Sequence, residues 1–262
     1  MIPYPRISPT IVKVGPFAIR WYGLMYIMGF ITSWFLFNYQ ARKKKIKGLT
    51  PQVVESFYFW IIVALVLGAR LGYVLFYNLG YYLQNPLRIF AVWQGGMSFH
   101  GGLIGLVIAG VLFCRKHKLD FWRVSDMLVA TVPPGLGFGR LGNFINGELF
   151  GRPSNVPWAM VFPQGGDIPR HPSELYEFFC EGVVLFIILW ILKDRVKRSG
   201  MLLAAFLILY GIIRFTLEFF RQPDPQLGFV AGPFTMGQIL SSAMVLAGVA
   251  LALWRRKGAK SI

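Results

Sequence analysis

The sequence predicts an all-α membrane protein with a single domain over residues 1–262 and about seven transmembrane helices. Three observations lead to this fold class. The chain is 55% hydrophobic and 15% charged, whereas a soluble domain usually carries about 25% charged residues. Its apolar residues gather in segments of the length that crosses a bilayer, about 20 residues. Its basic residues form short clusters beside these segments, as cytoplasmic loops do.

The apolar segments define the expected spans in chain order. We expect spans near Phe17–Tyr39, Ser56–Tyr77, Met97–Cys114, Val124–Asn143, Leu175–Leu192, Met201–Phe220 and Phe234–Trp254. The start of the chain lacks a basic stretch followed by a short apolar run and a small-residue cleavage site. No removable signal peptide is therefore expected, and the first segment is expected to remain as a span.

The basic clusters predict the orientation of the spans. Seventeen of the 27 Lys and Arg residues fall at 42–47, 115–123, 193–198 and 255–260. These clusters follow the first, third, fifth and seventh segments, so the positive-inside rule places the N-terminus outside the cytoplasm and the C-terminus inside. Topology thus accounts for the net charge of +16. No cluster has the interleaved aromatics of a nucleic-acid groove, and no nucleic-acid partner is expected.

The remaining connections are expected to lie on the outer side. Residues 78–96, 144–174 and 221–233 carry few basic residues and many Gly, Pro and aromatic residues. The longest, 144–174, is expected to form a small head, and long loops on one face indicate a working surface there. The sequence shows no internal repeat, which argues against an inverted-repeat transporter.

A glycine-rich stretch follows the pair Pro133-Pro134. Residues 135–153 are expected to form a poor uninterrupted helix, because glycine and proline disfavour helix interiors. A broken backbone at membrane depth survives where it lines a cavity, so this segment predicts one. It would focus four polar side chains at the outer membrane face: Arg140, Asn143, Asn146 and Glu148. The alternative is a turn rich in Asn and Gly that caps the fourth span.

A second polar pattern lies in the sixth span. Tyr210, Arg214, Glu218 and Arg221 are spaced so that all four fall within about 80° of one helix face. Glu218 can pair with either arginine, and one acid against two arginines leaves a surplus positive charge. That surplus suits a bound phosphate, since guanidinium groups grip phosphate oxygens bidentately. The alternative is an internal salt-bridge staple.

Three further residues in or beside the apolar segments remain open. Arg20 lies near an interface, where its charged end is expected to reach water. Arg70 is flanked by small residues and predicts either structural pairing or ligand contact. His100 lies at the outer entrance of the third span, where it serves either as a satisfied polar group or as a base for a thiol proton.

At these residues the chain resembles the prolipoprotein diacylglyceryl transferase family. The resemblance is carried by residues 139–151, GRLGNFINGELFG, and by similar segments at 21–26, 100–105, 170–177 and 210–224. It implies transfer of an sn-1,2-diacylglyceryl group from phosphatidylglycerol to the lipobox cysteine thiol of a prolipoprotein in the bacterial inner membrane. It implies that Arg140 and Arg214 are essential. It also implies a site lined by Tyr22, Asn143, Asn146, Glu148, Gly151, Tyr210 and Glu218, beside which Arg221 is a further binding candidate.

The chemistry of such a transfer agrees with these residue types. A thiol with a pKa near ~8.5 is mostly protonated at neutral pH, so a base helps. The leaving phosphate develops charge, which two fixed arginines would neutralise. No cofactor and no metal are expected, because no cluster has ligand spacing. An anion transporter, a metal-dependent phosphatidyl transferase and a scaffold are the alternatives that this pattern disfavours.

Overall fold

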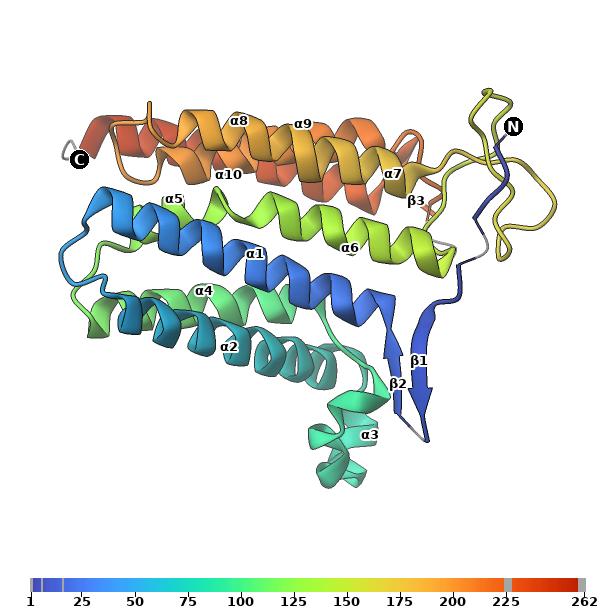
Figure 1. The fold of residues 1–262 in the computed structure, drawn as a ribbon, viewed down its shortest axis with the longest axis horizontal. Coiled ribbons are helices and arrows are strands. Elements are labelled where there is room, and N and C mark those ends of the chain that lie inside the picture. Colours follow the sequence, from blue (N-terminus) through green and yellow to red (C-terminus); the bar gives the residue numbers. More distant parts are fainter. Residues whose placement is uncertain (1, 6, 16, 224–227, 259–262) are drawn as a thin grey trace. The chain divides into compact units, whose positions relative to one another are not determined.

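The computed structural model describes residues 2–5, 7–15, 17–223 and 228–258. Its contacts divide the chain into two compact units, one made of residues 1–37 and 125–262 and the other of residues 38–124. A single domain over the whole chain stays a prediction. Helices account for 67% of the chain, which confirms a mostly helical protein. Figure 1 traces the elements along the sequence.

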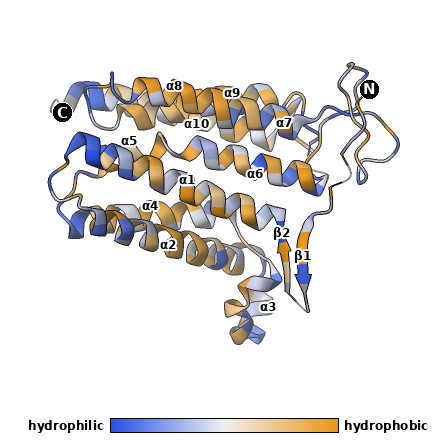
Figure 2. Ribbon diagram, in the orientation of Figure 1, coloured by the Kyte–Doolittle hydropathy of each residue, from blue (hydrophilic) through white to orange (hydrophobic). Residues whose placement is uncertain are grey.

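Among the described residues, four helices are long and apolar enough to cross a membrane. They are Pro51–Tyr77, Phe99–Lys116, Ser173–Leu192 and Met236–Lys257, and Met201–Leu217 is a shorter apolar helix. Apolar residues run along these helices while polar residues gather in the connections (Figure 2). The expected multi-pass membrane character is therefore supported, and a total of seven spans stays a prediction.

Unit 2, residues 38–124, is built on two closely packed helices. These are α2 (Pro51–Tyr77) and α4 (Phe99–Lys116), joined by the short helices α3 (Leu79–Gln84), η1 (Pro86–Phe90) and η2 (Val92–Gln94). Glycines allow the backbones to meet: a methyl group added at Gly101 would lie 2.3 Å from the carbonyl oxygen of Gly68. Small residues at such a crossing replace the side-chain packing that most helix pairs use.

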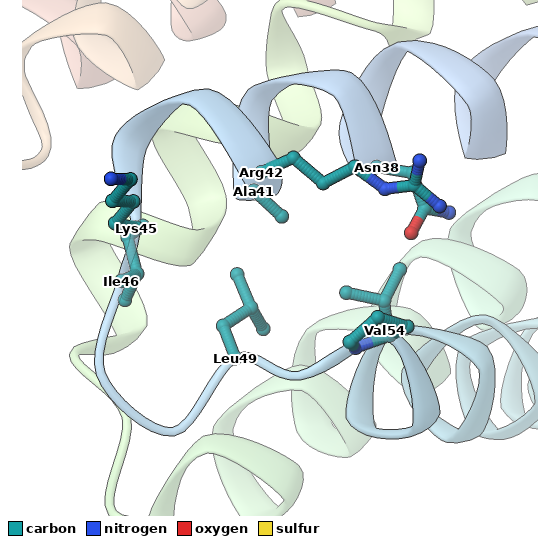
Figure 3. Close-up of a pocket in the computed structure, with 8 residues that line it drawn as sticks. Asn38, Ala41, Arg42, Lys45, Ile46, Leu49 and Val54 are labelled. Carbon is teal, nitrogen blue, oxygen red and sulfur yellow. The ribbon is translucent and has the colours of Figure 1, made fainter.

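The turn between α1 (Trp21–Lys44) and α2 encloses a small hollow in unit 2 (Figure 3). Apolar residues such as Leu49 and Val54 form part of its wall, and Arg42 and Lys45 add positive charge. None of the predicted site residues lines it. The hollow therefore lies in the first basic cluster rather than in the predicted site.

Unit 1 begins with a hairpin where the sequence predicted membrane helix. Strands β1 (Thr10–Val14) and β2 (Phe17–Arg20) pair antiparallel, and α1 starts only at Trp21. The predicted start of the first span at Phe17 is therefore wrong by four residues. β-Branched residues on both sides of the turn favour strands, and Gly15 has φ +58°, which a reversal of the chain needs.

The predicted fourth span, Val124–Asn143, is divided in the structure. Helix α5 (Phe121–Val129) ends before Thr131, and α6 (Val132–Asn146) begins with Pro133 and Pro134 in its first turn. Proline is tolerated there because the first N–H groups of a helix have no intrahelical acceptor. The glycine-rich stretch does not break α6, which continues to Asn146 and ends at left-handed Gly147. The predicted glycine break is thus wrong, and the real break lies upstream of the prolines.

The rest of unit 1 is a helical layer with a small second hairpin. Helix α7 (Ser173–Glu177), the π-helix η3 (Phe178–Val184) and α8 (Leu185–Leu192) follow one another without interruption. Helix α9 (Met201–Leu217) packs against α10 (Met236–Gly258), and β3 (Phe229–Ala231) pairs with β4 (Phe234–Thr235). The chain between α6 and α7, expected to form a head, folds over a cluster of Phe144, Met160 and Phe162. Its position outside the membrane stays a prediction.

Candidate functional site

Three buried glutamates lie on one face of the α7–η3–α8 helix. Glu174, Glu177 and Glu181 are each 0% exposed, and their spacing of three and four residues aligns them. The same face continues with Leu185 and Leu189, which are also 0% exposed. The face therefore changes from acidic to apolar along a single helix.

Arg140 of α6 and Arg214 of α9 meet these acids. Oε2 of Glu177 lies 2.9 Å from Nε of Arg140, and Oε1 of Glu177 lies 2.5 Å from Nη1 of Arg214. Glu218 completes the group, with Oε2 at 2.7 Å from Nη2 of Arg214. Glu181 is farther away, at 3.5 Å from Arg140 and 3.9 Å from Arg214. A single carboxylate thus bridges two arginines from different helices.

This cluster corrects the predicted surplus of positive charge. The prediction from the sequence counted Glu218 as the one acid near Arg214 and Arg221. In the structure, Glu177 and Glu181 also face Arg214. Burying a guanidinium without a partner is costly in an apolar interior, which explains why the acids accompany it. The expected pairing of Arg214 with Glu218 is present in the structure, and the electrostatic account needs the two further acids.

Close approach of α6 and η3 brings the charges together. A methyl group added at Gly182 would lie 2.7 Å from Cα of Gly137, and one added at Gly137 would lie 3.0 Å from Cα of Gly182. Larger side chains would separate the helices and pull Arg140 away from Glu177. Gly137 of the glycine-rich stretch therefore serves helix packing, together with Gly182, rather than a broken backbone.

The end of α6 carries a second polar group. Asn143 Nδ2 donates to Oε1 of Glu148 over 2.9 Å, and Asn146 Nδ2 donates to the same oxygen over 3.1 Å. Gly142, one turn before, faces Tyr22, whose ring a methyl group there would meet at 2.9 Å. The Tyr22 hydroxyl lies 3.1 Å from that of Tyr26. The structure therefore brings Asn143, Asn146 and Glu148 together, as predicted, with Tyr22 against the same helix.

Gly151 and Arg221 belong to a backbone junction. They form an isolated antiparallel bridge, and Gly151 donates its N–H to the carbonyl of His171. A methyl group at Gly151 would lie 2.6 Å from the Phe220 carbonyl oxygen. Close packing thus explains glycine at position 151. Arg152 strengthens the junction by donating from Nε to the carbonyl of Arg221 over 3.0 Å.

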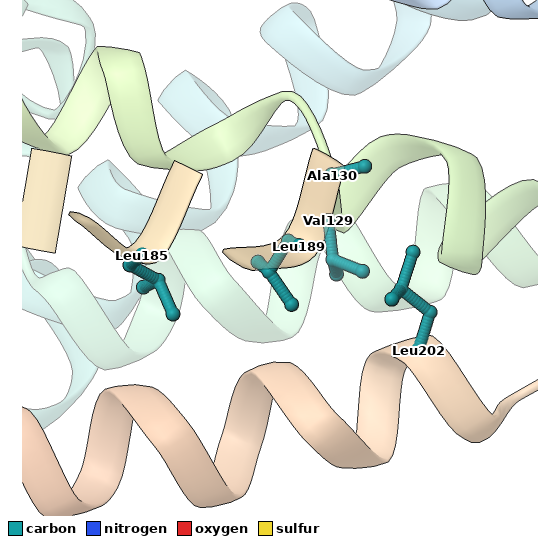
Figure 4. Packing of buried hydrophobic residues seen from close by; sticks show 5 residues of the cluster. All are labelled: Val129, Ala130, Leu185, Leu189 and Leu202. Carbon is teal, nitrogen blue, oxygen red and sulfur yellow. The ribbon is translucent and has the colours of Figure 1, made fainter. Parts of the chain in front are cut away.

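Tyr210 and His100 occupy different surroundings. Tyr210 packs against the apolar cluster of Val129, Ala130, Leu185, Leu189 and Leu202, whose members come from α5, the residue after it, α8 and α9 (Figure 4). His100 belongs to unit 2, where it is exposed in the first turn of α4 after the N-cap residue Ser98. Its role as a base therefore stays a prediction.

The side chains of Arg20 and Arg70 lie in different surroundings. Arg20 is exposed at the end of β2, and its position near water stays a prediction. Arg70 is 4% exposed and donates to the carbonyls of Arg88, Ile89, Gly95 and Gly96. Of the two roles left open for Arg70, the structure supports structural pairing, with backbone carbonyls in place of an acid.

Comparison with known proteins gives the family. The profile of the family described as prolipoprotein diacylglyceryl transferase matches residues 9–254. The chain belongs to this transferase family. A phosphatidylglycerol--prolipoprotein diacylglyceryl transferase of Desulfotalea psychrophila is 52% identical over 257 residues, covering 96% of this chain and 94% of its own. Proteins of the same name from Geobacter sulfurreducens and Rhodospirillum rubrum are 50% identical, with 95% and 98% of this chain and 96% and 95% of their own covered.

Three buried acids of this transferase-family chain were not predicted as site residues, and two of them, Glu177 and Glu181, belong to the arginine cluster. Glu174, Glu177 and Glu181 lie in an apolar segment, and their spacing is the signal that could have found them. Among the described residues, Oε2 of Glu177 and both carboxyl oxygens of Glu174 and Glu181 have no hydrogen-bond partner. Glu177 accepts a hydrogen bond from Arg214 at Oε1 and forms an ion pair with Arg140 at Oε2, whereas Glu181 forms longer ion pairs with both arginines.

Proposed function

We propose that this chain transfers the sn-1,2-diacylglyceryl group of phosphatidylglycerol to the lipobox cysteine thiol of prolipoproteins, the first step of lipoprotein maturation. A bond forms between the thiol sulfur and the glycerol carbon that carried the phosphate. The carbon–oxygen bond to that phosphate breaks, the thiol proton is taken up by a base, and glycerol 1-phosphate leaves. Family membership supports the reaction, and the buried arginine pair is the single feature of the structure that supports it most.

Arg140 is the proposed grip on the lipid phosphate. Among the described residues only its Nε is engaged, by Glu177 and Glu181, so its two terminal nitrogens remain for a ligand. Its side chain is 19% exposed, the larger value of the two arginines. A guanidinium that presents both terminal nitrogens matches two phosphate oxygens in plane.

Arg214 is proposed to neutralise the departing phosphate. Both of its terminal nitrogens are held by carboxylates, Nη1 by Glu177 and Nη2 by Glu218. A charge fixed in this way needs no reorganisation when charge grows on the leaving oxygen. Arg214→Gln should then lower turnover far more than it weakens phosphatidylglycerol binding.

His100 is proposed as the base for the peptide thiol. His100→Gln should lose activity that rising pH partly restores, because the thiol then ionises unaided. Turnover between roughly pH 6 and 9.5 brackets the reference thiol pKa and separates this signature from that of Arg214→Gln. Rescue of Arg214→Gln by alkali, without rescue of His100→Gln, would reverse the two roles. Full activity of His100→Gln at every pH would remove His100 as the base.

The remaining site proposals concern binding. Tyr22, Asn143, Asn146, Glu148, Gly151, Tyr210, Glu218 and Arg221 are proposed to line the substrate site. The polar group at the end of α6 supports this for Asn143, one turn after Arg140, and for Glu148, just past the end of the helix. For Gly151 the crowded backbone supports an indirect role through the position of the loop.

The proposed location is the bacterial inner membrane, with seven spans, a periplasmic N-terminus and head, and a cytoplasmic C-terminus. The basic clusters that follow the first, third, fifth and seventh expected spans support it. In a chain whose Cys114 and Cys180 are replaced, a periplasmic thiol reagent should label engineered cysteines at Ser154 and Gly228. It should leave cysteines at Lys44 and Lys197 unmodified, and labelling at Lys44 would overturn the orientation.

The reaction itself is tested by mass spectrometry. Purified protein, a lipobox peptide and phosphatidylglycerol vesicles should give a peptide heavier by one diacylglyceryl group and an equal amount of glycerol 1-phosphate. A peptide with serine in place of the lipobox cysteine is the control. An unmodified cysteine peptide, with folded protein present, would reject the proposed function.

A further inference from the structure

Among the described residues, Glu177 is the acid that lies closest to both arginines of the cluster. Its two oxygens divide between them, with Oε2 on Arg140 Nε at 2.9 Å and Oε1 on Arg214 Nη1 at 2.5 Å. The side chain is fully buried, so water does not screen these contacts. The contact with Arg214 is a charge-assisted hydrogen bond, which is among the stronger polar interactions in proteins, and the contact with Arg140 is an ion pair.

The way in which Glu177 holds Arg140 sets what Arg140 can offer. Glu177 meets Arg140 at Nε, and the two terminal nitrogens of Arg140 have no acceptor among the described residues. By taking Nη1 of Arg214, the same carboxylate fixes the distance between the two guanidinium groups. Two rigid cations at a set separation are what a phosphate with charge on several oxygens requires.

The backbone around Glu177 keeps the carboxylate in place. It is the last residue of α7, directly before the π-helical stretch Phe178–Val184, and π-helical turns often occur at functional sites. In that stretch Gly182 meets Gly137 of α6, the helix that carries Arg140. The acid and the arginine are therefore held by the same helix contact.

We infer that Glu177 is a positioning residue that orients Arg140 and Arg214 toward the phosphate of the lipid substrate. This inference rests on the proposed function. Glu177 itself touches no reacting atom and acts through the two arginines. Its loss should therefore disturb the alignment of the arginines in the transition state while leaving most of the cation charge that attracts the lipid.

Glu181 provides a matched control. It lies one turn further along the same face, is equally buried, and faces the same arginines at 3.5 and 3.9 Å. Replacing either acid by glutamine removes one formal negative charge from the same cluster. At Glu177 the replacement breaks the short contacts with both arginines, whereas at Glu181 it weakens two longer ones. A glutamine at position 177 has one acceptor oxygen, so whichever way its amide is turned, one arginine meets an N–H group instead.

The experiment compares wild type, E177Q, E177D and E181Q in phosphatidylglycerol vesicles with a lipobox peptide. Folded protein is quantified for each variant, and kcat and the KM for phosphatidylglycerol are measured per folded molecule. We expect E177Q to lower kcat roughly 10- to 100-fold with KM within about threefold of wild type. E177D keeps the charge but is too short to reach both arginines, so it should also lose kcat. E181Q should stay within about fivefold of wild type.

Each other outcome is decisive. Equal losses in E177Q and E181Q would show a charge effect and overturn the bridge, as would near-normal kcat in E177D. Wild-type kcat in folded E177Q would overturn the positioning role, leaving Glu177 as a stabilising residue only. If wild type itself transfers no diacylglyceryl group, the proposed function fails. Active wild type with unaffected variants rejects this inference alone.

Discussion

The two units each bury arginine in an apolar helix, but they satisfy it differently. In unit 2 every nitrogen of the Arg70 guanidinium donates to a backbone carbonyl. Within the described residues no carboxylate lies within salt-bridge distance of it. In unit 1 Arg140 and Arg214 pair with carboxylates, and the terminal nitrogens of Arg140 have no acceptor among the described residues. The acceptors of a buried arginine thus separate the structural role of Arg70 from the binding role proposed for Arg140.

Arg140→Lys is expected to have the largest effect on activity. A lysine keeps the charge and can still pair with Glu177, but it cannot present two coplanar donors to a phosphate. The rate of peptide modification should fall about 100-fold or more while the folded yield and thermal unfolding temperature change little. Arg20→Lys, at an exposed position, is the control and should be silent. A rate near wild type for Arg140→Lys would break the comparison.

Arg70→Lys should show the opposite pattern. One ammonium group cannot reach carbonyls of Arg88, Ile89, Gly95 and Gly96 together, so buried acceptors lose their donors. We expect a loss of about 2–3 kcal/mol in the free energy of unfolding, with normal turnover per folded molecule. Thermal unfolding in lipid nanodiscs measures the first quantity. Arg88→Lys is the control, and a turnover defect without destabilisation would assign Arg70 to the site.

Glycine substitutions test the same comparison, and we expect them to change stability and activity less than the arginine substitutions do. Gly137→Ala forces α6 from η3 and should cost about 1–2 kcal/mol of stability together with part of the activity. Gly139→Ala, on the same helix with nothing within 4 Å, should be neutral or stabilising by a few tenths of a kcal/mol, roughly. Gly101→Ala in unit 2 should reduce stability alone. Equal behaviour of positions 137 and 139 would argue against the helix contact.

The smallest expected effect is a dependence of stability on pH. The arginines do not contribute to it, because they stay protonated. Partial burial lowers the pKa of His171, whose Nδ1 lies 3.0 Å from the Tyr176 hydroxyl. Below about pH 6.5 the unfolded chain binds a proton that the folded loop resists, so stability is present above that pH and declines as pH falls. Hydrogen exchange of residues 150–172 should therefore quicken modestly below this pH. His171→Gln should remove the dependence, and an unchanged profile would exclude His171 as its source.

The sequence predicts the helices well because hydropathy dominates them. Each expected span overlaps a helix, since an apolar run of about 20 residues in lipid has few alternatives. The ends are less predictable. Phe17–Arg20 reads as apolar helix, yet it pairs with β1, because a hairpin partner earlier in the chain overrides local hydropathy.

The candidate site is predictable in its cations and less so in its acids. Arg140 and Arg214 stand out because a permanent charge in an apolar run is costly. Glu177 and Glu181 were missed, because their partners come from other helices and only tertiary packing reveals them. The prediction for the glycines was wrong for a related reason. Helix propensity predicts a break at Gly137, whereas the close contact with Gly182 requires a residue without a Cβ atom there.

The change of the α7–α8 face from glutamate to leucine has a consequence for where water can solvate the helix. Beyond Glu181 the face continues with Leu185 and Leu189, which pack with Ala130 and Leu202 into an apolar cluster. These four side chains offer water no hydrogen-bonding group. The polar part of this face therefore ends at Glu181.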